Sequence, residues 1–196
     1  KYSSSSNTLS DGTLEIKGDF TQESAGDRDS YSNFSAHNYH KVVLSGEGEQ
    51  VISFDNPSYS RFNILEVKNK SGEVSLNNVS INESIIGDII SKNDIYLYDA
   101  TLTLSNQTIK APNVYWISGG NISLSNGAKI DCNLIHGAGN ISVNGRVEIT
   151  GDYCITDRDG TGSSGKLTMA EADGYLLVYG DFVMRSKHNS SSNILS

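Results

Sequence analysis

The chain has 196 residues, the length of a single domain and enough to bury a hydrophobic core. Its net charge is −8, and its 15 basic residues are scattered, which argues against binding nucleic acid or an anionic membrane surface. The longest apolar runs hold only four or five residues, as at 114–117, so no segment is long enough to be inserted across a membrane.

The first ten residues recur at the far end of the sequence. Residues 1–10 read KYSSSSNTLS and residues 187–196 read KHNSSSNILS, and seven of the ten positions are identical when Lys187 is aligned with Lys1. Repetition at a fixed period is typical of tandem arrays. We therefore expect a single module over residues 1–196, made of one period (1–186) and the start of the next (187–196).

Apolar and polar residues alternate along most of the chain, which is the pattern of half-buried strands. In chain order the clearest stretches are TLEIKGDF (residues 13–20), DIYLYDATLTLS (94–105), NISLSNGAKI (121–130), NISVNGRVEI (140–149) and KLTMAEADGYLLVYGDF (166–182). The nearest approach to a helical pattern is NESIIGDIISKND (82–94), and Gly87 in its middle disfavours a helix. The sequence therefore predicts an all-β protein.

Three of these stretches share a motif in which two apolar positions precede Gly-Asp-aromatic. It occurs as LEIKGDF (14–20), VEITGDY (147–153) and LLVYGDF (176–182). A second element, Gly-Asn-Ile-Ser, occurs at 120–123 and again at 139–142. In a solenoid each position meets the same environment one coil later, whereas a β-sandwich has no reason to repeat its sequence. We expect a right-handed parallel β-solenoid (β-helix) with coils of about 19–29 residues.

The alternation also assigns side chains to the inside of the coils. Those expected to point inward, each toward its equivalent on a neighbouring coil, are Leu14, Ile16, Val147, Ile149, Leu176 and Val178. Glycine and asparagine suit tight corners because both tolerate the left-handed backbone conformation. Asparagines stacked in successive coils can pass amide hydrogen bonds along the stack. About eight coils at roughly 4.8 Å each would give a module about 40 Å long.

Three longer stretches resemble a known repeat module. They are GTLEIKGDFTQ (12–22), NYHKVVLSGEGEQVISFDNPSYSRFNILEVKN (38–69) and LTMAEADGYLLVYGDFVMRS (167–186). In order and spacing they resemble the tandem repeats of very large secreted surface proteins of clostridia and related Gram-positive anaerobes. The resemblance implies an elongated, extracellular, adhesin-like β-solenoid and brings no catalytic residues with it. Residues 71–111 match no motif of that module.

Neither end of the sequence reads as a cap. Residues 1–10 form a serine-rich connector that leads directly into a strand, and the far end stops after LLVYGDF and the same connector. Natural solenoids usually cover their open strand edges. We therefore expect a structural repeat of a long fibre, filament or stalk, uncapped at both ends, in which the next unit's LEIKGDF follows LLVYGDF head to tail. The residues expected to mediate this self-association are Leu14, Ile16, Gly18, Phe20, Leu176, Val178, Gly180 and Phe182.

Two further candidate sites lie in the second half of the chain. Cys132 and Cys154 are spaced so that they could fall on adjacent coils, either as small buried residues or as a disulfide. Asp157 and Asp159 precede two glycines, a pattern that calcium loops use. The acidic residue that closes such a loop is missing, so a solvated loop is the alternative.

We expect no enzymatic activity, because no feature of the sequence marks a catalytic group. Cleavage of a glycosidic bond requires two carboxylates facing one groove, and no such pair stands out. Polysaccharide degradation and carbohydrate binding are the alternatives, since outward aromatic residues could stack on a host or cell-surface glycan. The aromatic candidates are Tyr96, Tyr98, Tyr115 and Trp116, of which Trp116 is better explained as core.

Overall fold

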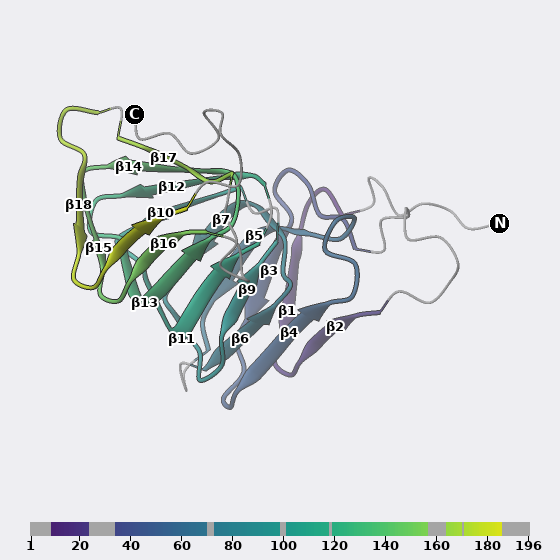
Figure 1. Ribbon diagram of the computed structural model, residues 1–196. Coiled ribbons are helices and arrows are strands. Elements are labelled where there is room, and N and C mark those ends of the chain that lie inside the picture. The colour runs from purple at the N-terminus through teal and green to yellow at the C-terminus, as the bar shows by residue number, and fades with distance from the viewer. Residues whose placement is uncertain are drawn as a thin grey trace.

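The computed structural model describes residues 9–23, 34–69, 73–98, 101–117, 119–156, 164–169 and 171–185. Its regular elements in these ranges are strands, and every pairing between named strands is parallel. The strands form three sheets, and along the chain each strand of the first sheet is followed by one or two strands of the second or third sheet (Figure 1). This is the parallel β-solenoid predicted from the sequence.

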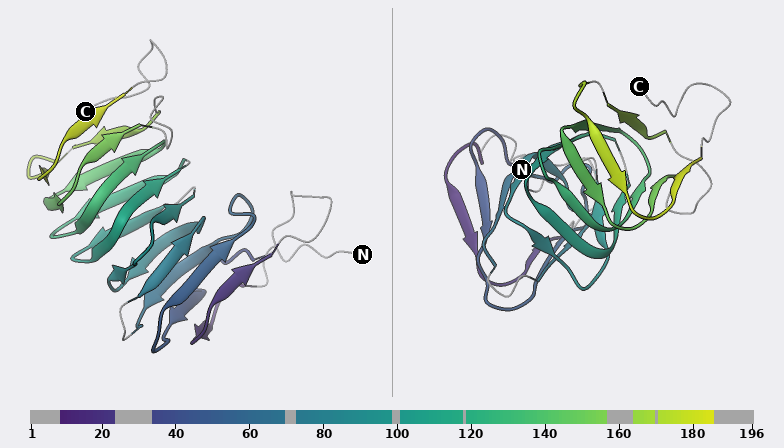
Figure 2. Two further views of the ribbon diagram at one scale, coloured as in Figure 1. Left: turned by 60° about the horizontal axis from the view of Figure 1, so that its bottom comes forward. Right: turned by 90° about the vertical axis from the view of Figure 1, so that its left-hand side faces the viewer.

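The first sheet takes one strand from each of eight coils. In sheet order its strands are β1 (Thr13–Ile16), β3 (Lys41–Leu44), β5 (Phe62–Val67), β7 (Ile81–Ile86), β10 (Leu102–Ser105), β12 (Asn121–Ser125), β14 (Asn140–Asn144) and β17 (Lys166–Thr168). Figure 2 shows these coils stacked from β1 at one end to the last strands at the other. The eight coils agree with the number expected from the repeat spacing.

The remaining strands form the other side of the solenoid. The second sheet contains β8 (Ile89–Ile90), β9 (Ile95–Leu97), β11 (Thr108–Trp116), β13 (Lys129–His136), β15 (Arg146–Ile149), β16 (Tyr153–Ile155), β18 (Tyr175–Val178) and β19 (Phe182–Met184). The third contains β2 (Phe20–Gln22), β4 (Gln50–Phe54) and β6 (Val74–Asn77). Single bridges from Glu73 to Ile90 and from Val79 to Leu97 join the third sheet to the second.

The length of a coil depends on its corners. In the middle of the stack the coils are short, since Leu104 pairs with Leu124 and Leu124 with Val143. Toward the first end the coils are longer. The number of residues from Phe20 to its partner Ile52 exceeds the coil length predicted from the sequence. The extra residues lie between strands, where an insertion leaves the stacking unchanged.

The core is filled by the inward positions of each strand, as the alternation predicted. Val147 and Ile149 are 0% and 1% exposed, and they pair in register with Leu176 and Val178 of the next coil. Those two residues are half-buried, since they belong to the last described coil and pack against the core from one side. Burial of such side chains contributes about 25 cal/mol per Å² of apolar surface, which is the main force that holds the coils together.

The strands of the later coils bend at one corner, which gives these coils three faces. β15 and β16 are separated there by a short turn at 150–152, whereas β13 runs through the same corner as one strand that pairs with both. In the first coils the third face is marked by the isolated bridges between Leu9 and Ala36 and between Ser35 and Arg61, just before β1, β3 and β5.

Candidate functional site

A ladder of side-chain hydrogen bonds runs along the bend of the later coils. Asn113 donates from Nδ2 to Asp94 Oδ1 at 2.9 Å, and Asn133 donates in the same way to Asn113 Oδ1 at 3.0 Å. Backbone donors continue the ladder: the Asp152 N–H bonds Asn133 Oδ1 at 2.9 Å, and the Asp181 N–H bonds Asp152 Oδ1 at 2.8 Å. Each coil therefore offers a side-chain oxygen to a donor of the next coil, in the manner expected of stacked asparagines.

The glycine of the Gly-Asp-aromatic motif makes room for this ladder. A Cβ on Gly151 would lie 2.3 Å from Asn133 Oδ1, and a Cβ on Gly180 would lie 2.3 Å from Asp152 Oδ1. In both cases the nearest atom is the ladder oxygen of the preceding coil, and backbone atoms of that coil lie within 2.8 Å as well. The two residues of the motif thus have different roles. The glycine leaves space for the side-chain oxygen of the preceding coil, and the aspartate carboxylate accepts a hydrogen bond from a backbone N–H of the following coil.

The first copy of the motif uses only half of this arrangement. Asp19 Oδ1 accepts a hydrogen bond from the Val51 N–H of the following coil at 2.8 Å, as Asp152 does from Asp181. Gly18 has no described atom within 4 Å of where a Cβ would stand, and its φ lies outside the left-handed region. Among the described residues, therefore, nothing requires a glycine at position 18.

The eight residues predicted to mediate self-association lie at the two ends of the described stack (Figure 2). They are Leu14, Ile16, Gly18 and Phe20 in the first coil and Leu176, Val178, Gly180 and Phe182 in the last. No described strand covers the outer edge of either coil, so Leu14 is 37% exposed and Phe182 is 44% exposed. A further coil stacked on either end would remove this apolar surface from water.

The motif aspartates of the last and first coils, Asp181 and Asp19, both have unused groups, although only Asp181 belongs to the ladder that begins at Asp94. Within the described residues the Asp181 carboxylate accepts no hydrogen bond, although the equivalent Asp152 carboxylate accepts one from Asp181 itself. At the other end the Asp19 N–H has no described acceptor, while the equivalent Asp152 N–H is bonded. The last coil thus ends in an acceptor and the first coil in a donor.

An aromatic stack fills the core of the later coils. Trp116 is 0% exposed, lies 4.8 Å from the His136 ring at an interplanar angle of 6°, and donates from Nε1 to the Gly119 carbonyl at 3.0 Å. Trp116 is therefore core, as expected, and not a surface platform. His136 Nδ1 lies 3.0 Å from the Tyr153 hydroxyl, and Nε2 lies 3.3 Å from the Gly139 carbonyl.

The outward tyrosines occupy a different place. Tyr96 and Tyr115 are half-buried on the outer face and stack on each other, with ring centroids 5.0 Å apart and an interplanar angle of 7°. Tyr98 follows the same strand as Tyr96 and, with Ile117, lines a shallow depression of about 480 Å³ against the turn at residues 55–58. The Ser58 hydroxyl donates to the Tyr98 hydroxyl at 3.3 Å across this depression.

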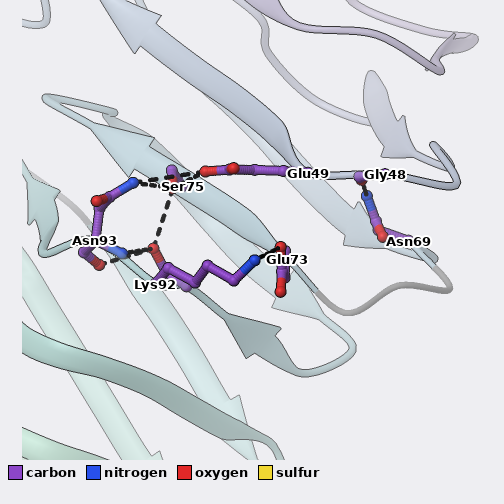
Figure 3. A network of polar contacts seen from close by, with 8 residues as sticks. Gly48, Glu49, Asn69, Glu73, Ser75, Lys92 and Asn93 are labelled. Carbon is purple, nitrogen blue, oxygen red and sulfur yellow. Dashed lines mark hydrogen bonds and ion pairs between the residues drawn. The ribbon is translucent and has the colours of Figure 1, made fainter.

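A polar network joins Glu49, just before β4, to the start of β6 and to the turn after β8 (Figure 3). Glu49 Oε1 accepts from the Ser75 hydroxyl at 3.3 Å and from Asn93 Nδ2 at 3.5 Å. Lys92 Nζ lies 2.7 Å from Glu73 Oε2, and this hydrogen bond raises the pKa of Lys92. Each carboxylate of the network is thus held by donors from neighbouring coils, and its contacts tie three coils together.

The two cysteines lie on adjacent coils, as predicted, but on opposite faces of their sheet. Cys132 faces the core at 7% exposure, and burial raises the pKa of its thiol to about 12. Cys154 pairs in register with Ile135, whose side chain points outward, and it is half-buried. Both are free thiols, so the structure contains no disulfide between them. Parallel pairing explains this, because side chains of opposite faces point away from each other.

The calcium candidates Asp157 and Asp159 fall outside the described residues. Within the described ranges no group of three or more histidine, cysteine, aspartate or glutamate residues could hold a metal ion. No helix among the described residues is long and apolar enough to cross a membrane.

No protein-family model, curated protein or solved structure matches this chain. The site is therefore defined by geometry alone. The sequence singles out the glycines and apolar residues of the motif, but it does not reveal the part that aspartates 19, 152 and 181 play. The available signal was the motif itself, in which aspartate follows glycine in all three copies.

Proposed function

We propose that this chain is a structural repeat of a long extracellular fibre, filament or stalk, in which units stack head to tail. The observation that carries the proposal is the complementarity of the two described ends. One end has open apolar strand edges with an unused acceptor, the Asp181 carboxylate, and the other has similar edges with an unused donor, the Asp19 N–H, at the equivalent motif position. The extracellular location rests on the resemblance to secreted surface proteins of Gram-positive anaerobes.

The solenoid suits such a role because its coils stack without a closing element. Each added coil extends every sheet by one strand and lengthens the stack by about 4.8 Å. Eight coils give each unit a rise of about 40 Å. Contacts between unlike ends form open filaments rather than closed rings, so the same surfaces can be used at every junction.

The length of multi-unit chains tests this proposal. Chains of one, two and four copies of the period 1–186 should behave in small-angle X-ray scattering as rods that lengthen by about 40 Å per copy. The matched control inserts a flexible Gly-Ser linker after Ser186, which should give separate modules with variable spacing. If the chains with and without the linker have the same distribution of distances, the repeats do not stack and the proposal is wrong.

Carbohydrate binding is a second candidate function, favoured by the depression beside Tyr98. Its lining combines one tyrosine ring with carboxylate, amide and hydroxyl groups of residues 55–58 and Asn78, and glycans are bound by such mixtures of ring and polar contacts. The ligand would be a host or cell-surface glycan. Binding to a glycan array that Tyr98→Ala abolishes would support this role, whereas equal binding by both proteins would rule out this depression as the site.

A further inference from the structure

One copy of the Gly-Asp-aromatic motif already stacks on another within the chain. Val147 pairs in register with Leu176, and Tyr153 pairs with Phe182, with ring centroids 5.3 Å apart. At the corner between these pairs the Gly180 N–H donates to the Gly151 carbonyl at 3.1 Å. The structure thus contains a complete example of how one copy of the motif recognises the next.

The first copy of the motif has every group needed to continue that stack. Gly18 has open space where Gly180 contacts the Asp152 carboxylate, and the Asp19 N–H has no described acceptor where the Asp181 N–H is bonded. Among the described residues, neither a crowded Cβ position nor a left-handed φ gives Gly18 a purpose. It does have one if an aspartate of another unit lies over it.

We propose that residues 14–20 of each unit stack on residues 176–182 of the preceding unit, with the Asp181 carboxylate accepting from the following unit's Asp19 N–H. Phe20 then packs against Phe182, as Phe182 packs against Tyr153 within the chain. This inference rests on the proposed function and specifies its junction.

The repeat period allows this stacking. If residues 187–196 of one unit are residues 1–10 of the next, the following unit's Leu14 comes one coil after Leu176. The length of that coil lies between the step from Leu124 to Val143 and the longer step from Phe20 to Ile52. The junction therefore needs no coil shorter or longer than those within the chain.

The junction rotates each unit relative to the one before. Within a chain β1 and β17 belong to the same sheet, but the proposed stacking places β1 on β18, which belongs to the second sheet. In this stacking β2 of the following unit lies beside β19 of the preceding unit, and Leu9 of the following unit lies beside β17. Each unit is therefore turned by one of the three faces of the solenoid, about a third of a turn. A simple continuation without rotation would place β1 on β17 instead.

Engineered cysteine pairs distinguish the two registers in a chain of two periods. Thr13→Cys in the second unit should form a disulfide with Tyr175→Cys in the first, because these positions are equivalent to the paired Arg146 and Tyr175. Without rotation Thr13→Cys would instead pair with Thr168→Cys of the first unit, which continues the register of the first sheet. Neighbouring strands are about 4.8 Å apart, which is within reach of a disulfide. Peptide mass spectrometry under non-reducing conditions identifies the bond.

Gly18→Ala provides the matched control, because the same substitution can be placed at the junction or at the free end. In the second unit the new methyl group should clash with Asp181 and lower the yield of the Thr13–Tyr175 cross-link by at least about tenfold. In the first unit the substitution should leave the yield unchanged. The inference is wrong if the Thr168 pair forms, if neither pair forms, or if the two Gly18→Ala variants behave alike. A rod of doubled length with the Thr168 cross-link would overturn the rotated junction while leaving the proposed function intact.

Discussion

Lowering the pH from 7 to 5 is expected to destabilise the solenoid through one of its buried histidines, His136. His136 is 0% exposed, and its burial lowers its pKa to about 4. A carbonyl oxygen can only accept, so Nε2 carries the proton that bonds Gly139, and Nδ1 accepts from the Tyr153 hydroxyl. A second proton would place a charge in the core and replace that acceptor with a second donor.

The sign and size of the effect follow from proton linkage. In the unfolded chain a histidine has a pKa of about 6.5, so between about pH 6.5 and pH 4 the unfolded state binds more protons than the folded state. Stability is therefore complete above about pH 6.5, falls as the pH falls, and stops falling below about pH 4. A difference of about 2.5 pKa units corresponds to about 3 kcal/mol in total, of which about 2 kcal/mol is lost by pH 5.

Urea denaturation at pH 7, 6 and 5 measures this loss. Two carboxylates also contribute a pH dependence, because hydrogen bonds from Lys68 and Lys41 lower the pKa of Glu66 and one from Thr150 lowers that of Asp131. Their contribution is present above the ordinary carboxylate pKa and disappears only at lower pH, so it lies outside the window of pH 5–7.

His136→Gln removes the titrating group and should abolish the slope between pH 7 and 5, whatever its effect on the stability at pH 7. His37→Gln is the control, since His37 is half-buried near the surface beside Ser35, and it should retain the slope of the unaltered protein. A flat stability profile in the unaltered protein, or an unchanged slope in His136→Gln, would refute the reasoning. An NMR titration of the His136 ring protons gives the folded-state pKa directly.

Three further predictions concern the corner glycine, the thiols and catalysis. Gly151→Ala should lower the free energy of unfolding by about 1–3 kcal/mol, because its Cβ would lie 2.3 Å from Asn133 Oδ1. The control Gly18→Ala, in the single chain, should change the free energy of unfolding by less than about 0.5 kcal/mol. Equal urea midpoints for the two variants would contradict the role given to the corner glycine. In native protein at pH 8 a thiol reagent should modify half-buried Cys154 slowly, because burial raises the pKa of its thiol, and Cys132 only after unfolding; equal rates for the two thiols in the native protein would show that the core around Cys132 is open. The purified chain should release no reducing ends or unsaturated sugars from a panel of glycans; such a release, abolished by one Asp→Asn substitution, would establish an enzyme.

The sequence predicted the fold because the same information is repeated along the chain. Alternation indicated the strands, and recurrence of similar stretches from coil to coil indicated the parallel stacking, which the register of Leu104, Leu124 and Val143 confirms. Even the unmatched segment at 71–111 follows the pattern. Gly87, which argued against a helix there, has a φ of 94° and separates β7 from β8 at a corner.

The sequence did not predict which corner of the solenoid each copy of the motif occupies. The motif specifies only a strand, a corner and a second strand, and this local unit fits more than one corner of a three-faced coil. Thus LEIKGDF joins the first sheet to the third, whereas VEITGDY and LLVYGDF lie within the second sheet.

The ladder also gives the stack a direction, which limits how two units can meet. Every step from Asp94 onward passes from an oxygen of one coil to a donor of the next, so the last described coil ends in the Asp181 carboxylate; Asp19 and Val51 make a bond of the same direction in the first coils, where the Asp19 N–H is unused. Two last coils facing each other would bring two carboxylates together without a donor, a repulsion that adds to the net charge of −8. Two first coils would bring donors together without an acceptor. At the proposed junction only unlike ends are complementary, so all units of a filament point in the same direction. One Gly-Asp pair at each end of the unit sets this direction.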